Sequence, residues 1–258
     1  MKYRAKEKYG ILCGAERSQE WLLPWWWARY REHNDYPVTF IDFGMSQEML
    51  KWCAERGEVV TLENELFVSH RSAIDPSLIK EWEDAYGWTI WNARLTWFKK
   101  PFAFLHSRYK RGIWIDLDCE VLGPLKPLFK YCDASSQIGM VRDYTADHLP
   151  KFHPQAHYNG GVIVFEHNAP ILQQWAEDAL TRNHLFSGDD KLLSDLIYSK
   201  QINVVEIPEI FNWRLARGFN LSAVILHWVG SGGKAYIRKH GGLKPSLDAF
   251  YQSCRGKL

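Results

Sequence analysis

The sequence lacks the long apolar segments that carry a chain into or across a membrane. Nowhere among its 258 residues does an uninterrupted apolar run reach about eighteen residues, so we expect no transmembrane helix. The N-terminus, Met1-Lys2-Tyr3-Arg4-Ala5-Lys6-Glu7-Lys8, is charged and precedes no long apolar region. This pattern argues against a signal peptide.

Cysteine is scarce, and charge of one sign is not in excess. The five cysteines are Cys13, Cys53, Cys119, Cys132 and Cys254. An odd number without metal-ligand spacing predicts reduced thiols in a cytoplasmic protein. The 32 Lys and Arg residues nearly balance the 30 Asp and Glu residues, which leaves a net charge of +2. A charge this small gives no indication of a nucleic-acid partner.

Internal repeats, low-complexity tracts and linkers are also missing. The hydrophobic fraction of 46% lies in the range of globular proteins. A chain of 258 residues is long enough to bury a sizeable core. We therefore expect a single domain over residues 1–258.

The first quarter of the chain alternates short apolar runs with amphipathic segments. Strands are predicted at 9–13, 37–42 and 59–62, with helices between them that begin near Ser18 and Ser46. This order predicts an α/β fold with a mainly parallel central sheet flanked by helices. Ligands of such sheets bind at the carboxyl ends of the strands.

The rest of the chain continues the alternation. Helices are predicted at 76–86, 91–100, 102–109, 169–181, 189–199 and 245–254, and strands at 113–115, 137–142, 162–165 and 224–228. Asp75 precedes Pro76 as a helix cap, and Pro101 is expected to stop a helix. The segment 143–157 reads as a long loop. Its three histidines, His148, His153 and His157, match no zinc signature, and solvated loop histidines are the favoured interpretation.

A pair of carboxylates follows the central strand. Asp116 and Asp118 are two residues apart, so an extended backbone would point both side chains to the same side. Two adjacent carboxylates repel each other unless a cation lies between them, and Mg²⁺ or Mn²⁺ prefers such ligands together with substrate phosphates. The alternative is an Asp-x-Asp that only ends a strand in a solvated turn.

A glycine-rich turn with a lysine follows the last strand, Gly230-Ser231-Gly232-Gly233-Lys234. Exposed backbone amides and one lysine suit a diphosphate. The spacing to Lys234 does not fit a P-loop, and as an isolated motif the turn could be an ordinary loop.

Four sequence blocks together resemble one family. They are Ile115-Asp116-Leu117-Asp118, Asn159-Gly160-Gly161-Val162, Gly188-Asp189-Asp190-Lys191-Leu192-Leu193, and His227-Trp228-Val229-Gly230 with Lys234. Their order and separations resemble the nucleotide-sugar glycosyltransferases of the GT-A (Rossmann-like) fold, and among these the retaining family 8 type. The resemblance covers roughly residues 8–240 and includes Lys100-Pro101 before the central strand.

The resemblance implies roles for individual residues. Asp116, Asp118 and His227 would ligate Mn²⁺ or Mg²⁺, with Asp116 also on the ribose. Gly230 and Lys234 would hold the diphosphate. The remaining donor contacts would be Cys13, Gly14, Glu16, Arg94, Asn159 and Gly160, and Asp189 would lie near the reactive carbon of the sugar. Asp189 and Asn159 are thus the candidate catalytic residues.

Three departures from the family pattern bear on these roles. The step from Gly230 to Lys234 is one residue longer than usual, Ala235-Tyr236 replaces Pro-Trp, and Gly188 stands where many members carry an acid. Ordinary structural roles remain open for Arg94 as a surface residue, Glu16 as a helix-start acid and Asn159 as a turn former. Asp189 begins a predicted helix, whose N-terminus should keep its carboxylate ionised.

The expected function is metal-dependent transfer of a hexose from a nucleotide sugar, a UDP-sugar, with retention of configuration. The acceptor could be a glycan, a lipid-linked glycan or a protein. Two alternatives stay open: a nucleotidyltransferase, and a degenerate, non-catalytic protein that binds sugar nucleotides or a partner. A basic C-terminal region is compatible with peripheral contact with an anionic membrane, although a solvated basic face is the simpler interpretation. Its residues are Lys234, Arg238, Lys239, His240 and Lys244.

Overall fold

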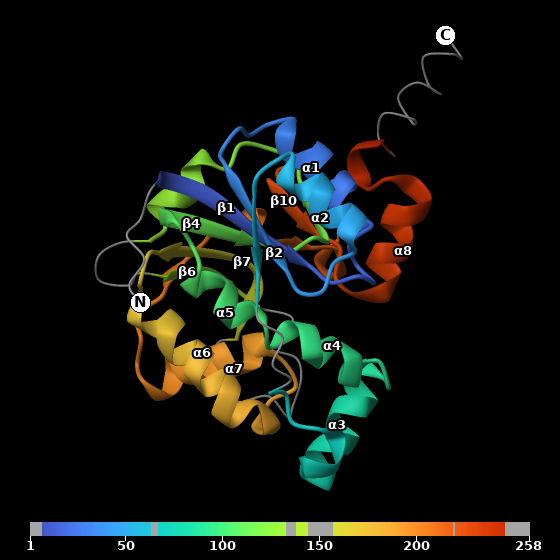
Figure 1. Cartoon of the computed structure of the whole chain (residues 1–258), viewed down its shortest axis with the longest axis vertical. Coiled ribbons are helices and arrows are strands. Elements are labelled where there is room, and N and C mark those ends of the chain that lie inside the picture. Colours follow the sequence, from blue (N-terminus) through green and yellow to red (C-terminus); the bar gives the residue numbers. More distant parts are fainter. Residues whose placement is uncertain (1–6, 63–66, 133–137, 144–156, 219, 246–258) are drawn as a thin grey trace.

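A seven-stranded sheet runs through the middle of the molecule in the order β3-β2-β1-β4-β7-β6-β8 (Figure 1). The computed structural model describes residues 7–62, 67–132, 138–143, 157–218 and 220–245. The strands of this sheet are β1 (Glu7–Ala15), β2 (Val38–Asp42), β3 (Glu58–Thr61), β4 (Tyr109–Ile115), β6 (Ile138–Arg142), β7 (Tyr158–Glu166) and β8 (Val205–Glu206). All run parallel except β7, which lies antiparallel between β4 and β6. The predicted α/β fold with a mainly parallel sheet is confirmed.

Side chains from the sheet alternate between two cores. Ile113 and Ile115 of β4 pack into one core, and Trp114 between them packs into the other. Val164 and Phe165 of β7 divide in the same way. Successive residues of a strand face opposite sides of the sheet, so a nearly continuous apolar run is what a sheet covered on both faces requires.

Helices cover both faces of the sheet. They are α1 (Leu22–Arg31), α2 (Gln47–Ala54), α3 (Pro76–Tyr86), α4 (Ile90–Trp97), α5 (Lys100–Leu105), α6 (Pro170–Arg182), α7 (Asp189–Ser199) and α8 (Gly230–His240). Residues of α1, α2 and α8 share the first core, and residues of α5, α6 and α7 share the second. Figure 1 shows these two groups above and below the sheet, with α3 and α4 projecting at the lower right. None of the helices in the described residues is long and apolar enough to cross a membrane.

A second, smaller sheet lies beside the end of β4. It has the order β5-β10-β9, from β5 (Cys119–Val121), β10 (Ile225–His227) and β9 (Trp213–Arg214). Strands β5 and β10 are antiparallel, and their register places Cys119 opposite His227. The small sheet therefore brings the residues after the central strand to a segment more than a hundred positions further along the chain.

Several local predictions are confirmed by the structure. Ser46 caps α2 by accepting a hydrogen bond from the Met49 amide at 3.2 Å. Asp75 caps α3 by accepting one from the Ser77 amide at 2.8 Å. Helix α7 has the predicted bounds. Short polar side chains favour these positions because they satisfy amides that the first turn of a helix leaves unpaired.

Three local predictions are wrong, and the direction of one strand was not predicted. Ser18 does not cap α1; its hydroxyl contacts Glu16 instead. Pro101 begins α5 rather than stopping a helix, as suits a residue without an amide proton. Strand β7 is antiparallel, which its sequence does not signal. The glycine-rich segment at 230–234 is the first turn of α8 rather than a loop. His148, His153, Cys254 and the predicted helix after Pro245 lie outside the described residues.

Candidate functional site

The candidate site begins where β4 ends. The Asp116 amide donates to the Gly161 carbonyl at 2.9 Å, which continues the β4–β7 pairing by one residue. The chain then turns, and the Cys119 amide donates to the Asp116 carbonyl at 3.0 Å. The backbone from Asp116 to Asp118 is thus a turn and not the expected extended strand, so the two carboxylates contact different partners.

Asp118 lies in a buried cluster with one histidine and one lysine. Its Oδ1 is 3.3 Å from Nε2 of His227, and its Oδ2 is 2.6 Å from Nζ of Lys234. Burial by itself raises the pKa of Asp118, but the charges and hydrogen bonds of His227 and Lys234 hold that pKa well below its usual range. Asp118 is therefore an anion, and a cationic group already neutralises it.

A main-chain amide fixes the orientation of the His227 ring through a series of hydrogen bonds. The Gly161 N–H donates to Oδ1 of Asn159 at 2.9 Å, so this atom is an acceptor. It also accepts from Nδ2 of Asn212 at 2.8 Å. Consequently Oδ1 of Asn212 accepts from Nδ1 of His227 at 2.9 Å. With its proton on Nδ1, the ring points Nε2 at Asp118, and a neutral His227 would face that carboxylate with a lone pair.

The two glycines of β7 give this arrangement its space. A Cβ on Gly161 would lie 2.4 Å from Cε1 of His227, so a side chain at this position cannot coexist with the ring. The carbonyl of Gly160 accepts from Nζ of Lys100 at 3.3 Å. The backbone of the Asn-Gly-Gly block thus leaves room for the His227 ring and accepts a hydrogen bond from Lys100.

Lys100, the first residue of α5, forms the second part of the site. Its buried Nζ lies 3.0 Å from Oδ1 of Asp116 and 3.6 Å from Oδ2 of Asp189. Burial lowers the pKa of Lys100, and the two carboxylates more than offset that effect, so the pKa is raised. Trp114 holds Asp116 from the other side, with Nε1 at 2.6 Å from Oδ1. Lys100 therefore links the end of β4 to the start of α7.

Asp189 is the first residue of α7, as predicted, but its protonation differs from expectation. Burial raises the pKa of Asp189 to about 7, with Lys100 opposing the shift and Asp190 and Asp116 adding to it. The prediction that the helix N-terminus keeps Asp189 ionised is corrected, because the cost of removing the carboxylate from water is larger. Its Oδ2 has no hydrogen-bond partner among the described residues. A buried carboxylate oxygen that accepts no hydrogen bond is available to a ligand.

The predicted nucleotide-lining residues lie at the same edge of the sheet, with Cys13 and Gly14 in the last residues of β1 and Glu16 directly after it. Cys13 is fully buried in the core, and burial raises the pKa of its thiol. Gly14 packs so closely that a Cβ would lie 2.4 Å from the Phe43 ring. Glu16 is partly exposed, and Asp42 accepts from the amides of Gly44 and Met45 at 2.8 and 2.7 Å. Cys13 can reach a ligand only through its backbone.

The structure does not bring Arg94 into contact with the charged cluster. Its side chain is fully buried and donates to the carbonyls of Asn183 and Phe186. The guanidinium also lies 4.6 Å from the centre of the Trp82 ring, and burial lowers its pKa to about 10. These contacts tie α4 to the segment before α7, which is a structural role. A direct contact of Arg94 with the donor remains a prediction.

The start of α8 completes the site on the side of Asp118. Gly230 has a φ of +81°, a conformation that favours glycine, and Lys234 stands in the first turns of this 11-residue helix. Helix N-termini present unpaired amides and a partial positive charge, which suits an anionic group such as a diphosphate. The N-terminus of α8 thus suits a diphosphate, which is the property that the sequence predicted for a glycine-rich turn at this position.

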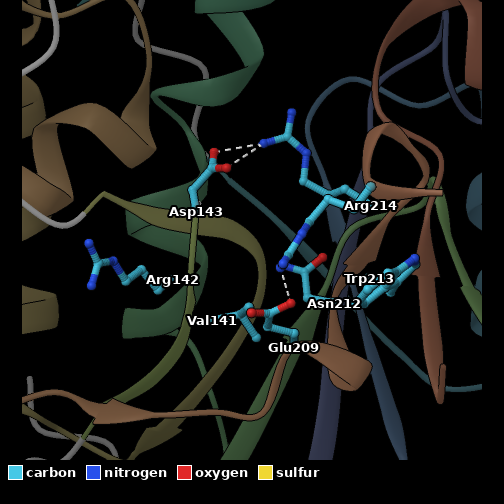
Figure 2. A pocket seen from close by; sticks show the side chains of 8 residues that line it. Val141, Arg142, Asp143, Glu209, Asn212, Trp213 and Arg214 are labelled. Carbon is cyan, nitrogen blue, oxygen red and sulfur yellow. Dashed lines mark hydrogen bonds and ion pairs between the residues drawn. The ribbon is translucent and has the colours of Figure 1, made fainter. Parts of the chain in front are cut away.

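A pocket borders the site through Asn212 (Figure 2). Figure 2 shows Arg214 pointing at Asp143, and both carboxylate oxygens of Asp143 lie 2.7 Å from Nη1 of Arg214. This ion pair joins β9 to the end of β6. Asn212 lines this pocket and also accepts a hydrogen bond from Nδ1 of His227, so the orientation of the histidine depends on a residue of the pocket wall.

Sequence reasoning missed two residues of the site. Lys100 was noted only as part of a Lys-Pro pair, and a lysine beside a proline is a weak signal for a buried ion pair. Asn212 carried no signal, because an isolated asparagine is usually a turn residue. Both become meaningful only once the fold has placed them.

Comparison with solved structures shows which fold this is. No family model matches the sequence, and no curated protein matches it either. The galactosyltransferase LgtC, solved with donor and acceptor sugar analogs, superposes with a TM-score of 0.61 at 13% identity over 91% of this chain and 96% of that chain. Mouse xyloside xylosyltransferase 1 has a TM-score of 0.53 at 14% identity, covering 85% of this chain and 97% of that chain.

A third similar structure is the mannosyltransferase Ktr4p of S. cerevisiae in complex with GDP, with a TM-score of 0.52 at 12% identity. It covers 80% of this chain and 72% of that chain. The likeness to these structures confirms the GT-A fold that the four sequence blocks predict.

Proposed function

We propose that this chain is a metal-dependent glycosyltransferase that transfers a hexose from a UDP-sugar to an acceptor hydroxyl with retention of configuration. The observation that carries the proposal is the buried cluster of Asp118, His227 and Lys234 at the N-terminus of α8. Beside it lies the second cluster, Asp116, Lys100 and Asp189. A metal and diphosphate site next to a carboxyl group for the sugar is the arrangement that such a transfer needs.

The donor set supports a divalent cation. Oxygen of Asp118, sulfur of Cys119 and nitrogen of His227 lie within 4.8 Å of one another. Asn212 on Nδ1 leaves Nε2 of His227 facing a carboxylate, an arrangement that a shared cation would stabilise. Carboxylate and imidazole ligands suit Mn²⁺, and Mg²⁺ accepts the carboxylates. We propose Asp118 and His227 as ligands, joined by Asp116. When bound, the metal would supply positive charge to the diphosphate oxygens.

The chain's own residues would act on the two ends of the bond that breaks. Lys234 and Gly230 at the N-terminus of α8 would hold the diphosphate and stabilise the charge that develops on it. Gly14, Glu16 and the backbone of Cys13 would line the nucleotide. Asn159 accepts a hydrogen bond from Asn212 and so helps to orient His227. Gly160 would approach the donor sugar.

Asp189 would lie against the donor sugar, where its Oδ2 has no hydrogen-bond partner among the described residues. As the anomeric bond breaks, the sugar becomes oxocarbenium-like, and an adjacent carboxylate stabilises it. Lys100 positions this carboxyl group and favours its charged form. The acceptor oxygen then bonds to the same carbon from the face that UDP leaves, and the proton of the acceptor hydroxyl passes to the departing diphosphate oxygen.

The decisive experiment incubates the protein with UDP-hexoses labelled in the sugar, with and without Mn²⁺. We expect slow metal-dependent release of the sugar from UDP, and in the presence of an acceptor a product with the donor's anomeric configuration. Release of pyrophosphate would instead indicate a nucleotidyltransferase, and binding without turnover a degenerate protein. GDP-hexoses should react at least tenfold more slowly. An inverted product would refute the assignment of retention.

Asp118→Asn tests the metal site within the same assay. The variant keeps the shape of the side chain and removes one charge, so donor hydrolysis should fall by two or more orders of magnitude while the fold stays intact. Asp84→Asn is the matched control, because Asp84 is an exposed partner of Lys80. Activity of Asp118→Asn within a few-fold of the parent would exclude Asp118 as a ligand.

The proposal extends to the domain organisation, the location and the acceptor. We propose one domain over residues 1–258, and a reducing, cytoplasmic location supported by the buried free thiols of Cys13, Cys53 and Cys119. The acceptor is a glycan, a lipid-linked glycan or a protein. Peripheral contact with an anionic membrane through the basic end of α8 is compatible with the exposed residues there, but the structure does not favour it over solvent contact.

A further inference from the structure

A strip of aromatic side chains starts at the candidate site and leads away from it. Trp97, the last residue of α4, packs against Gly188, where a Cβ would lie only 3.2 Å from its ring. Gly188 immediately precedes Asp189. The Trp97 ring in turn meets the ring of Tyr86 edge to face, with 6.1 Å between centres. We name Trp97, Tyr86 and Trp88 the aromatic strip.

The strip becomes more exposed with distance from Asp189. Trp97 is half-buried, Tyr86 is 39% exposed and Trp88 is 68% exposed. Trp88 lies two residues beyond Tyr86, across the turn at Gly87. The strip therefore presents two exposed aromatic side chains to solvent. Large exposed aromatics gathered beside a site usually mark a binding surface.

The exposed end of the strip is held in place. Gly87, with a φ of +69°, turns the chain from α3 into α4 and sets Trp88 at the corner. The guanidinium of Arg71 lies 5.2 Å from the centre of the Trp88 ring, and Nε of Arg71 is fixed 2.8 Å from Oε1 of Glu83. An aromatic ring that is fixed before a ligand arrives loses little entropy on binding.

The strip also interacts electrostatically with the first turn of α7. Burial lowers the pKa of Lys191, but Asp190, Tyr86 and Asp143 act in the opposite direction and the pKa is raised. The Tyr86 hydroxyl is thus within electrostatic range of the residue that follows Asp190.

We propose that the aromatic strip is the binding platform for a carbohydrate acceptor whose hydroxyl is delivered to Asp189. The inference rests on the proposed function and specifies the class of its acceptor. Sugar rings present apolar C–H faces that pack on aromatic rings, while their hydroxyls bind the polar groups around them. Continuity of the strip with Gly188 and Asp189 is what selects the acceptor over an unrelated partner.

Charge around the strip argues against a membrane as its occupant. The segment 71–88 carries two cationic residues, Arg71 and Lys80, against four acidic ones, Asp75, Glu81, Glu83 and Asp84. A net negative surface is repelled by anionic lipids. Neutral sugar rings are not repelled by this charge.

The test uses the full chain on an array of immobilised oligosaccharides, read without a donor. We expect the parent protein to bind a subset of glycans, and Trp88→Ala to bind them about tenfold or more weakly. Trp88→Phe should recover most of the affinity. Tyr198→Ala is the matched control, because Tyr198 is 45% exposed near the far end of α7. With the strongest glycan as acceptor, Trp88→Ala should raise its KM and leave acceptor-free donor hydrolysis unchanged.

Three outcomes would overturn the proposal: unchanged glycan binding by Trp88→Ala, no binding of the parent protein to any arrayed oligosaccharide, or loss of binding to phosphatidylserine vesicles as the effect of Trp88→Ala. The last outcome would reassign the strip to a membrane. Failure of donor hydrolysis in the parent protein would instead refute the proposed function. Because the array requires no turnover, the two failures are distinguishable.

Discussion

The imidazole of His227 has one orientation because a main-chain amide sets the hydrogen bonds that lead to it. The Gly161 N–H can only donate, so Asn159 must accept, Asn212 must donate to Asn159, and His227 must donate to Asn212. No ionisable group takes part before the ring itself. The orientation of the ring therefore does not depend on the charge of either asparagine or of the amide that precedes it.

Gly161→Ala tests whether this arrangement holds a metal. The added methyl group would lie 2.4 Å from Cε1 of His227 and must displace the ring or β7. We expect Mn²⁺ affinity, measured by calorimetry, to fall about 10- to 100-fold. Gly232→Ala is the control, since a Cβ there meets no described atom within 4 Å. Equal Mn²⁺ affinity in the two variants would argue against His227 as a ligand.

In the absence of metal, Asp118 should make the free energy of unfolding depend on pH in the acidic range. Its pKa is lower in the folded chain than its ordinary value of 3.8, so the folded state favours the carboxylate. Such a group contributes stability above its ordinary pKa and loses that contribution as the pH falls below it. In chelator, the free energy of unfolding should therefore drop more between about pH 6 and pH 3 for the parent protein than for Asp118→Asn. Parallel pH profiles would contradict the shift.

At the scale of elements, a buried carboxylate joins β5 to the segment after α8. Glu120 is fully buried and accepts from Nε1 of Trp228 at 2.9 Å, the Leu243 amide at 2.7 Å and the Lys244 amide at 3.2 Å. Burial raises the pKa of Glu120, and the three donors oppose that shift. Since β5 begins directly after Asp118, this attachment also fixes α8 and its lysine relative to the metal site.

Removing the Glu120 side chain should separate these elements. Glu120→Ala leaves buried donors unpaired, and we expect it to lower the free energy of unfolding by about 3 kcal/mol. Glu120→Gln keeps one acceptor oxygen and should lose roughly half as much. Urea titrations check both values. Glu55→Ala, at a side chain that is 73% exposed, is the control, and a Glu120→Ala midpoint equal to that of the control would exclude the attachment.

The elements also show where sequence reasoning succeeds. Helix α7 and the caps at Ser46 and Asp75 were predicted correctly because local periodicity and capping chemistry determine them. The direction of β7 and the helical form of 230–234 were not, because strand pairing and packing against the first core decide them. The four blocks identified Asp118, His227 and Lys234, whereas Lys100 and Asn212 depend on long-range contacts that no short motif encodes.

At the scale of the whole molecule, nucleotide and metal should stabilise the fold together. A ligand that binds only the folded state raises the melting temperature by an amount that grows with the logarithm of its concentration relative to its Kd. The diphosphate of UDP is expected to bind Lys234, α8 and the metal at once, so UDP with Mn²⁺ should raise the melting temperature by several degrees and UDP in chelator by much less. Thermal scans at fixed UDP concentration measure this. Equal shifts with and without Mn²⁺ would contradict a shared site.

The antiparallel pairing of β5 with β10 has a consequence for biosynthesis. Asp118 meets His227 and Lys234 only after the ribosome has added more than a hundred further residues. At about 5 to 20 residues per second, this interval lasts roughly 6 to 23 s. During that time the nascent chain can fold β1 to β4, but Asp118 has neither of its cationic neighbours. Fragments that end before β10 should therefore have no transferase activity. The reaction centre should be among the last parts of the protein to assemble during synthesis.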